Sequence, residues 1–240
     1  MKQVPPFEWR EDSLKLRQFV YEFWCERSYG PNMRDMHEGV ALSRRQILDA
    51  LYELQMGGMC VLDLNSPHQS MHRFLPFSGY PTPVKAFIGE RFLGYIGCAM
   101  ETVAFSKMPP FEGQEVRIES YCACCLAPVT VTSKDGKTLS QQPGTVLIHV
   151  GLNPWDWNKI SHNPMCDSMN YVIDAGHARK YEGMVSSKGV VFTMTQAEGL
   201  VKGVADNRMW DYNWPTGSGD PGQVIEGIRA LGVDVSPWEQ

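Results

Sequence analysis

The chain has 240 residues, 43% of them hydrophobic and 20% charged, so it is long enough to bury a substantial core. Its net charge of -5 argues against nucleic acid as the main partner. The longest nearly apolar run, Phe92 to Met100, is too short to span a membrane, and Met1 to Arg10 lack the apolar stretch of a signal peptide. We therefore predict a cytoplasmic protein with no membrane partner.

Three helices are predicted in the N-terminal third. Apolar residues at helical spacing predict an amphipathic helix from Asp12 to about Arg27, capped by Asp12 or Ser13. A short helix is expected around Met33 to His37. Ser43 and Gln46 then form an S-x-x-Q capping box, which predicts the start of a third helix.

Two strands are expected to follow these helices. Cys60 to Leu64 and His72 to Phe77 have strand character, and Asn65-Ser66-Pro67 between them favours a turn. Three helices followed by a hairpin is the order of a winged helix. We therefore predict a winged-helix-like unit over residues 1–84, joined by the stiff segment Tyr80 to Pro83 to a second domain over residues 85–240.

A winged helix raises the question of DNA binding, which the charge distribution argues against. Residues 1–84 contain nine Lys or Arg and ten Asp or Glu, a net charge of -1, and Arg44-Arg45 is the only basic doublet. Phosphate contacts need more positive charge than this. We predict that residues 1–84 pack against the second domain and do not bind duplex DNA.

The second domain is predicted to combine a mixed or antiparallel sheet with short helices, which makes the protein α+β. A hairpin is expected around Gly89-Glu90, between strands Val84 to Ile88 and Arg91 to Tyr95. Further strands are expected at Val116–Ser120, Val129–Thr132, Val146–Val150 and Val190–Met194, with a turn at Lys134–Lys137 and a loop at Tyr212–Asp220. Short helices are expected at Asp174–Tyr181 and Pro221–Leu231, and the capping box Thr195–Glu198 is expected to start another helix.

A thiol and a carboxylate stand three residues apart in an apolar stretch. Cys98 is predicted to open a short helix capped by Gly97, with Glu101 on the same face. A helix N-terminus lowers the pKa of a thiol, and apolar surroundings raise the pKa of a carboxyl group, so a thiolate and a proton carrier could share one site. In the alternative interpretation, Cys98 is a small buried residue and Glu101 lies on the surface.

The remaining cysteines give weaker signals. On a strand, Cys122 and Cys124 would share one face and Cys125 the other, a pattern that does not match a structural zinc site. His162 lies four residues before Cys166, but the intervening Pro164 disfavours the helix that would bring both to one metal. Before any resemblance is considered, Cys166 could equally be a buried structural residue.

Several segments together resemble the alkylmercury lyase family. The resemblance covers roughly residues 40–210, and the family pattern reads C-A-L-D, then C-x-A-T-G-x-P-V, then a cysteine after an aromatic residue. In this chain the matching segments are Tyr80–Val84, Cys98-Ala99-Met100-Glu101, Cys122–Val129, Met165-Cys166 and Gln196–Leu200. Glu101 replaces the family's aspartate, and Gly97 stands where an aromatic residue often precedes the first cysteine.

The resemblance implies an enzyme that cleaves carbon–mercury bonds by protonolysis. It makes Cys98 and Cys166 the two catalytic cysteines and Glu101 the proton carrier, and all three would contact Hg(II). Trp155, Trp157 and Met165 are candidate apolar walls. The implied substrate is an organomercurial, no cofactor is required, and external thiols remove the Hg(II) product, with cellular thiols or a mercuric reductase as acceptors.

Two other functions fit the same residues. The thiol site could sequester a soft metal such as Hg(II) or Cu without cleaving any bond, because thiolates favour soft cations. A metal-responsive regulator would instead use the winged-helix unit to bind DNA. Release of a hydrocarbon separates the lyase from the sequestering protein, and a salt-dependent gel shift would identify the regulator.

Overall fold

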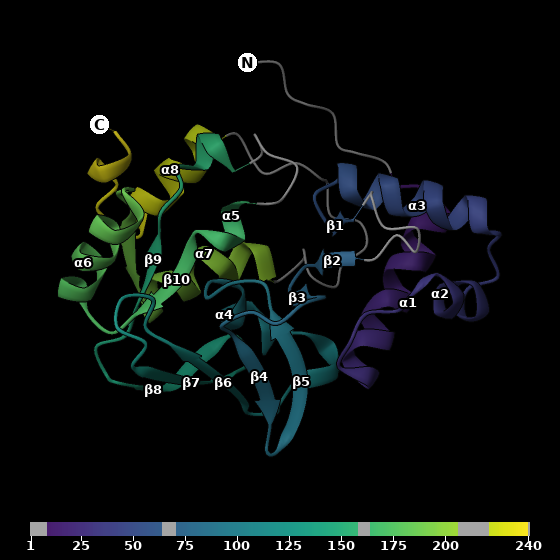
Figure 1. The fold of residues 1–240 in the computed structure, drawn as a ribbon, viewed down its shortest axis with the longest axis horizontal. Coiled ribbons are helices and arrows are strands. Elements are labelled where there is room, and N and C mark those ends of the chain that lie inside the picture. Colours follow the sequence, from purple (N-terminus) through teal and green to yellow (C-terminus); the bar gives the residue numbers. More distant parts are fainter. Residues whose placement is uncertain (1–8, 64–70, 158–163, 206–220, 240) are drawn as a thin grey trace.

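The computed structural model describes residues 9–63, 71–157, 164–205 and 221–239, which form the expected α+β fold (Figure 1). Three N-terminal helices, α1 (Glu11–Arg27), α2 (Met33–Gly39) and α3 (Arg44–Met56), lie together beside an eight-stranded sheet. The predicted capping box of α3 is confirmed, because the Gln46 N–H donates to the Ser43 hydroxyl at 3.3 Å.

The predicted cap of α1 by Asp12 or Ser13 is wrong. The helix begins at Glu11, after Arg10, whose side chain makes no capping hydrogen bond. Ser13 is buried, and its hydroxyl donates to the carboxylate of Glu53 on α3. Arg10 Nε donates to the same carboxylate at 3.0 Å. Side chains at the start of α1 therefore bind α3 instead of capping their own helix.

Two antiparallel sheets follow, and all strand pairs among the described residues run antiparallel. The larger has the strand order β1-β2-β3-β5-β4-β6-β7-β8, and the smaller has the order β10-β9-β11. Their bounds are β1 (Cys60–Leu62), β2 (Met71–Phe74), β3 (Phe77–Ser78), β4 (Lys85–Ile88), β5 (Arg91–Ile96), β6 (Val116–Tyr121), β7 (Pro128–Lys134), β8 (Lys137–Gln142), β9 (Leu147–Val150), β10 (Met169–Val172) and β11 (Val190–Thr193).

The two strands expected after α3 do pair with each other, but they are not a separate unit. β1 pairs with β2, but β2 pairs with β3 and β3 with β5, so they belong to the large sheet. The predicted strand His72 to Phe77 is interrupted at Leu75-Pro76, since proline has no N–H for the ladder. The predicted turn Asn65–Pro67 lies outside the described residues. The winged-helix detail and the boundary at residue 84 stay predictions.

Aromatic packing joins α1 to the sheet and to α4 (Glu101–Phe105). Trp24 of α1 stacks on Phe77 with ring centroids 5.1 Å apart, and Phe77 meets Phe105 of α4 edge-on at 5.4 Å. Each such pair contributes about 0.5–1.5 kcal/mol beyond its buried area. The N-terminal helices therefore pack on the sheet, as expected, and share its core with α4.

The remaining helices lie mainly around the smaller sheet (Figure 1). They are α5 (Pro164–Asp167), α6 (Ala175–Val185), α7 (Met194–Ala205) and α8 (Pro221–Ala230), with 3₁₀ turns at Pro109–Phe111, Pro154–Asp156 and Ser236–Trp238. The Asp174 cap of α6 is confirmed. The predicted box at Thr195–Glu198 is wrong, because Thr193 and Gln196 cap α7 and Glu198 accepts from the Thr138 N–H. The predicted loop Tyr212–Asp220 lies outside the described residues.

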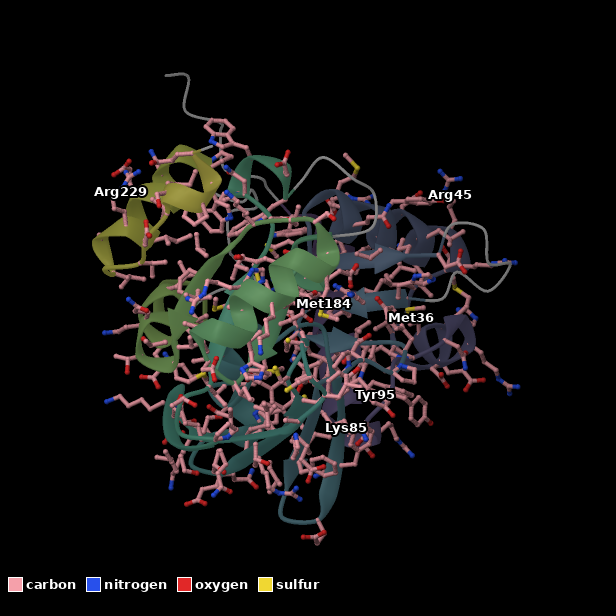
Figure 2. The ribbon with its side chains drawn as sticks, turned by 60° about the vertical axis from the view of Figure 1, so that its left-hand side comes forward. Met36, Arg45, Lys85, Tyr95, Met184 and Arg229 are labelled. Carbon is pink, nitrogen blue, oxygen red and sulfur yellow. The ribbon has the colours of Figure 1, made fainter. Side chains whose placement is uncertain are left out.

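Arg45 of α3 and Arg229 of α8 are exposed and lie at opposite ends of the molecule (Figure 2). Each pairs with a carboxylate on its own helix, Asp49 and Glu226 respectively. Exposed pairs of this kind contribute little to stability, so the fold depends on its apolar core. Across the described ranges, no helix is both long enough and apolar enough to cross a membrane.

Candidate active site

Strand β5 leads directly to Cys98. The Gly97 N–H donates to the Pro76 carbonyl at 2.8 Å, and the Ala99 N–H donates to the Met169 carbonyl of β10 at 3.1 Å. These bonds hold Cys98 between the two sheets. The prediction that Cys98 opens a helix capped by Gly97 is wrong: helix α4 begins at Glu101, after Met100. The backbone at Ala99 binds the smaller sheet instead of continuing a helical turn.

Cys166 lies in the short helix α5. The described helix begins at Pro164. Proline fits the first helical position because the N–H there needs no partner within the helix. The prediction that no helix joins His162 to Cys166 stays a prediction, because His162 lies outside the described residues. The chain then enters β10, which brings Met169 beside Cys98.

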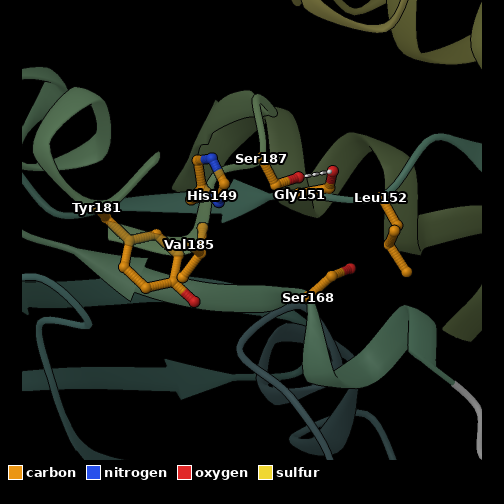
Figure 3. Close-up of a pocket in the computed structure, with 7 residues that line it drawn as sticks. All are labelled: His149, Gly151, Leu152, Ser168, Tyr181, Val185 and Ser187. Carbon is orange, nitrogen blue, oxygen red and sulfur yellow. Dashed lines mark hydrogen bonds between the residues drawn. The ribbon is translucent and has the colours of Figure 1, made fainter. Parts of the chain in front are cut away.

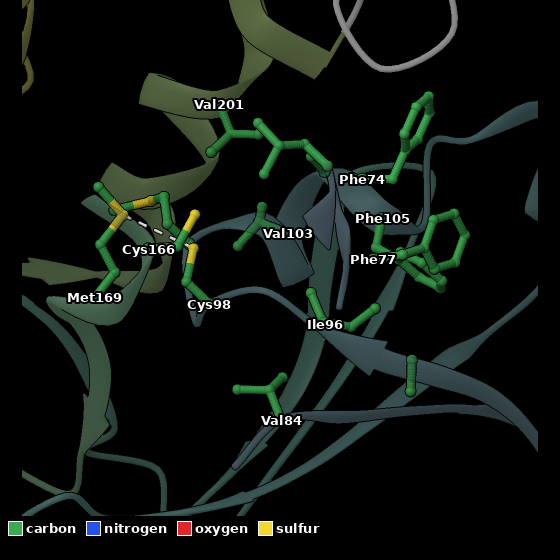
Figure 4. Close-up of a cluster of buried hydrophobic side chains, with 14 of the residues drawn as sticks. Phe74, Phe77, Val84, Ile96, Cys98, Val103, Phe105, Cys166, Met169 and Val201 are labelled. Atoms are coloured by element: carbon green, nitrogen blue, oxygen red, sulfur yellow. Dashed lines mark hydrogen bonds between the residues drawn. The ribbon is translucent and has the colours of Figure 1, made fainter. Parts of the chain in front are cut away.

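Cys98, Glu101 and Cys166 meet in space. One ligand atom from each, the two sulfurs and a carboxylate oxygen, lies within 4.8 Å of the other two. Cys98 and Cys166 are each 2% exposed, and Glu101 is half-buried. Figure 4 shows both thiols among apolar side chains, with the Cys98 thiol donating to Met169 Sδ at 3.8 Å. The predicted proximity of the two sulfurs is confirmed.

The environment holds the proton on Cys98. Burial raises the pKa of the Cys98 thiol well above its ordinary value, and the neighbouring Cys166 and Glu101 raise it further. The expectation that this thiol has a lowered pKa is therefore wrong. Its physical basis, a helix beginning at Cys98, is missing, and the backbone N–H of Glu101 only partly opposes the effect of burial.

Arg73 of β2 lies near Cys166, and the sequence did not indicate it as a residue of the site. Its side chain is 2% exposed, and it donates to the Tyr80 hydroxyl from Nη2 at 2.8 Å and to the carboxylate of Asp167. Burial opposes the charge of Arg73, but Cys166, Asp167 and Tyr80 raise its pKa overall. The available signal was an arginine within the otherwise largely apolar predicted strand His72–Phe77.

The cluster Cys122–Cys125 is not on a strand. These residues form the turn between β6 and β7, so the expected sharing of strand faces is wrong. Cys122 is buried against Val172 and Ala178, whereas Cys125 is exposed. Within the described ranges, Cys98, Glu101 and Cys166 are the sole group of three or more potential metal ligands.

The candidate apolar walls are placed unequally. Trp155 is 55% exposed, while Trp157 and Met165 are partly buried against the core. Trp157 Nε1 donates to the Leu152 carbonyl at 3.0 Å, which fixes its ring locally. The structure therefore makes Trp155 the weakest of the three candidates for a wall.

A cavity of about 160 Å³ lies elsewhere, over β9 and α6 (Figure 3). It is lined by His149, Gly151, Leu152, Ser168, Tyr181, Val185 and Ser187. The fully buried His149 meets Glu182 at 3.2 Å, and burial lowers the pKa of its imidazole. None of the three clustered residues lines this cavity, so we place the candidate site at the thiols, where the chemistry is.

The fold and this group define an α+β protein with a buried centre of two thiols and one carboxyl group. The sequence model of the alkylmercury lyase family, MerB, matches residues 77–205. This match covers more than half of the chain and includes Cys98, Glu101 and Cys166. The chain belongs to the alkylmercury lyase family.

A solved structure supports the fold independently. The mercury-bound form of MerB2 superposes with a TM-score of 0.62 at 20% sequence identity, covering 86% of this chain and 94% of that one. At this identity the likeness establishes the fold alone. A search among curated proteins found no match.

Proposed function

We propose that this chain is an organomercurial lyase that uses Cys98, Cys166 and Glu101 to cleave carbon–mercury bonds. The observation that carries the proposal is the meeting of two sulfurs and a carboxylate oxygen within 4.8 Å in a buried setting. Mercury(II) is a soft cation that prefers thiolates, and a carboxyl group can carry the proton that the carbon must receive.

The first steps bind the substrate through sulfur. One cysteine thiolate attacks mercury in R–Hg–X and displaces X⁻, forming a mercury–sulfur bond. The thiol of the second cysteine passes its proton to the Glu101 carboxylate, and the resulting thiolate also binds mercury. Two sulfurs then raise the electron density on the metal and weaken its bond to carbon. The raised pKa of Cys98 suits the role of the thiol that arrives protonated.

The cleavage step returns the proton. Glu101 delivers it to the carbon atom, and the electron pair of the carbon–mercury bond becomes the new carbon–hydrogen bond. The products are the hydrocarbon R–H, Hg(II) held by the two cysteines, and the Glu101 carboxylate. Two external thiols then exchange for the protein sulfurs, which regain their protons as Hg(II) leaves. No resident cofactor enters this scheme.

The product needs an acceptor, and thiol chemistry identifies its class. Small cellular thiols, or a mercuric reductase, would receive Hg(II). A cytoplasmic location fits the proposal because reducing conditions keep thiols free. Cys98 and Cys166 are both free in this structure.

The test follows the hydrocarbon. Purified protein is incubated with methylmercury and excess thiol, and methane is measured by gas chromatography. We expect catalytic methane release that continues over several turnovers. Binding of Hg(II) without methane would contradict the lyase proposal and favour soft-metal sequestration. The Cys125→Ser variant is the matched control, since Cys125 is exposed in the turn between β6 and β7 and should leave methane release unchanged.

A further inference from the structure

Gly97 lies directly against the carboxyl group of Glu101. A Cβ atom added at Gly97 would lie 2.4 Å from Glu101 Oε2 and 3.5 Å from Glu101 Cδ. Heavy atoms cannot approach to 2.4 Å without a covalent or hydrogen bond between them. The carboxyl group of Glu101 therefore occupies the space that a side chain at position 97 would need.

The backbone does not explain the glycine at this position. Gly97 is not among the glycines in the left-handed region, unlike its near neighbour Gly94, which has φ of 137°. An alanine could therefore adopt the Gly97 backbone without conformational strain. What position 97 requires is empty space beside Glu101.

We propose that Gly97 is a positioning residue for Glu101, and that the size of residue 97 and the length of residue 101 are coupled. Without a side chain, Gly97 leaves a seat in which the longer glutamate carboxyl rests within reach of the two sulfurs. An aspartate at position 101 is one methylene shorter, so its carboxyl would lie roughly 1–1.5 Å nearer its own backbone and leave the seat. The inference rests on the proposed function, in which Glu101 carries the proton.

The obstacle at position 97 is of a kind that permits a clean test. At Gly79 an added Cβ would meet the Met71 carbonyl oxygen, a backbone atom, at 2.1 Å, so substitution there disturbs the fold. At Gly97 the nearest atom is the end of a flexible side chain, which can move. Gly97→Ala should therefore fold normally while displacing the Glu101 carboxyl group.

The experiment is a double-mutant cycle with the parent, Gly97→Ala, Glu101→Asp and the double variant. We expect Gly97→Ala to lower kcat for methane release about 100-fold, because a displacement of about 1 Å can cost that much. Glu101→Asp should stay active, because its carboxyl group is unobstructed and can still turn toward the thiols, whereas the added Cβ of Gly97→Ala blocks the present carboxyl position. In the double variant the shorter side chain should restore most of the loss. Hg(II) affinity should stay within about twofold, since both sulfurs remain.

A matched control and a second readout separate this inference from the proposed function. Gly183→Ala on α6, where an added Cβ meets open space, should leave kcat unchanged. Steric coupling also predicts that Gly97→Ala lowers the Tm and that Glu101→Asp relieves the loss, whether or not hydrocarbon is released. Parent-like kcat in Gly97→Ala, or strictly additive effects on both kcat and Tm, would overturn the inference. A parent that releases no methane would overturn the proposed function, whereas non-additive Tm values would still support the steric pair.

Discussion

Two regions of this molecule are rich in cysteine, and they differ in how the chain brings their sulfurs together. Cys122, Cys124 and Cys125 are close in sequence, yet their turn exposes one thiol and buries another in a separate apolar cluster. Cys98 and Cys166 are far apart in sequence, yet their sulfurs meet with Glu101. The Ala99–Met169 hydrogen bond, which ties the segment after β5 to β10 of the smaller sheet, achieves what local spacing does not.

The largest effect should come from removing either sulfur of the buried centre. Cys98→Ser or Cys166→Ser should abolish methane release, because a hydroxyl group is neither soft nor appreciably ionised at neutral pH. Cys124→Ser and Cys125→Ser should retain the parent rate. Gas chromatography of methane provides the measurement. Normal turnover in both serine variants of the buried pair would remove the contrast between the two regions.

Removing the Glu101 carboxyl group should have the next largest effect, since this group carries the proton in the proposed cleavage. Glu101→Gln should bind Hg(II) through the two sulfurs but release methane at least about 100-fold more slowly, in line with the usual share of general acid–base catalysis. Glu101→Asp should stay active. Methane measured at fixed times and Hg(II) titration of the same samples separate cleavage from metal binding. Cleavage by the Gln variant at the parent rate would exclude a role for the carboxyl group.

Burial should also make stability depend on pH. The pKa of Cys98 is raised by burial, and burial raises the pKa of Cys25 to about 12. The folded protein thus keeps protons that the unfolded chain loses above its ordinary thiol pKa of about 8.5. The free energy of unfolding should keep its full value below that pH and fall as pH rises, by up to about 1.4 kcal/mol per pH unit for each such thiol.

Urea unfolding between about pH 7.5 and 10.5 under reducing conditions tests this dependence. Cys98→Ala should make the decline shallower. Cys125→Ala should leave it unchanged, because its exposed sulfur meets water in both states. A decline of equal steepness in Cys98→Ala and the parent would show that this thiol is not the source.

Removing the Met169 thioether should have the smallest effect of these changes. Its thioether lies 3.8 Å from Cys98 Sγ, and sulfur of this type favours soft metals. Met169→Leu keeps the volume and removes the sulfur, so we expect Hg(II) affinity to fall by less than about tenfold, or ~1.4 kcal/mol. Competitive titration with a small dithiol measures it. Met36→Leu, in the buried face of α2, is the control. Equal Hg(II) affinities of the two variants would show that the Met169 thioether does not contribute to binding.

Local patterns in the sequence predicted the elements that depend on local interactions. The capping box of α3, the hairpin of β4 and β5 and the Asp174 cap of α6 were all correct. Strand β10, only four residues long, was not predicted. The start of α4 was misplaced because the Ala99 N–H, just before this helix, binds the Met169 carbonyl on that strand. Elements that take their partners from distant segments are the ones that the sequence could not define.

The same reasoning applies to the candidate site. Cys98 and Glu101 were found from their spacing, because two side chains only three residues apart stay close where the chain turns, although Cys98 precedes helix α4. Cys166 came from the resemblance to a family, since its own surroundings suggested only a buried thiol. Arg73 and the seat at Gly97 depend on distances between side chains, which no spacing encodes.

The contact between Arg73 and Asp167 bears on how far this protein can be shortened. Asp167 adjoins Cys166, and the guanidinium that binds it comes from β2, ahead of the family-matched region that begins at residue 77. A fragment starting at residue 77 would keep both clustered thiols and Glu101 in its sequence but would lose the cation that fastens α5 to the large sheet. The smallest independently working piece of this chain should therefore begin before β2 and include strands that the family signature leaves out.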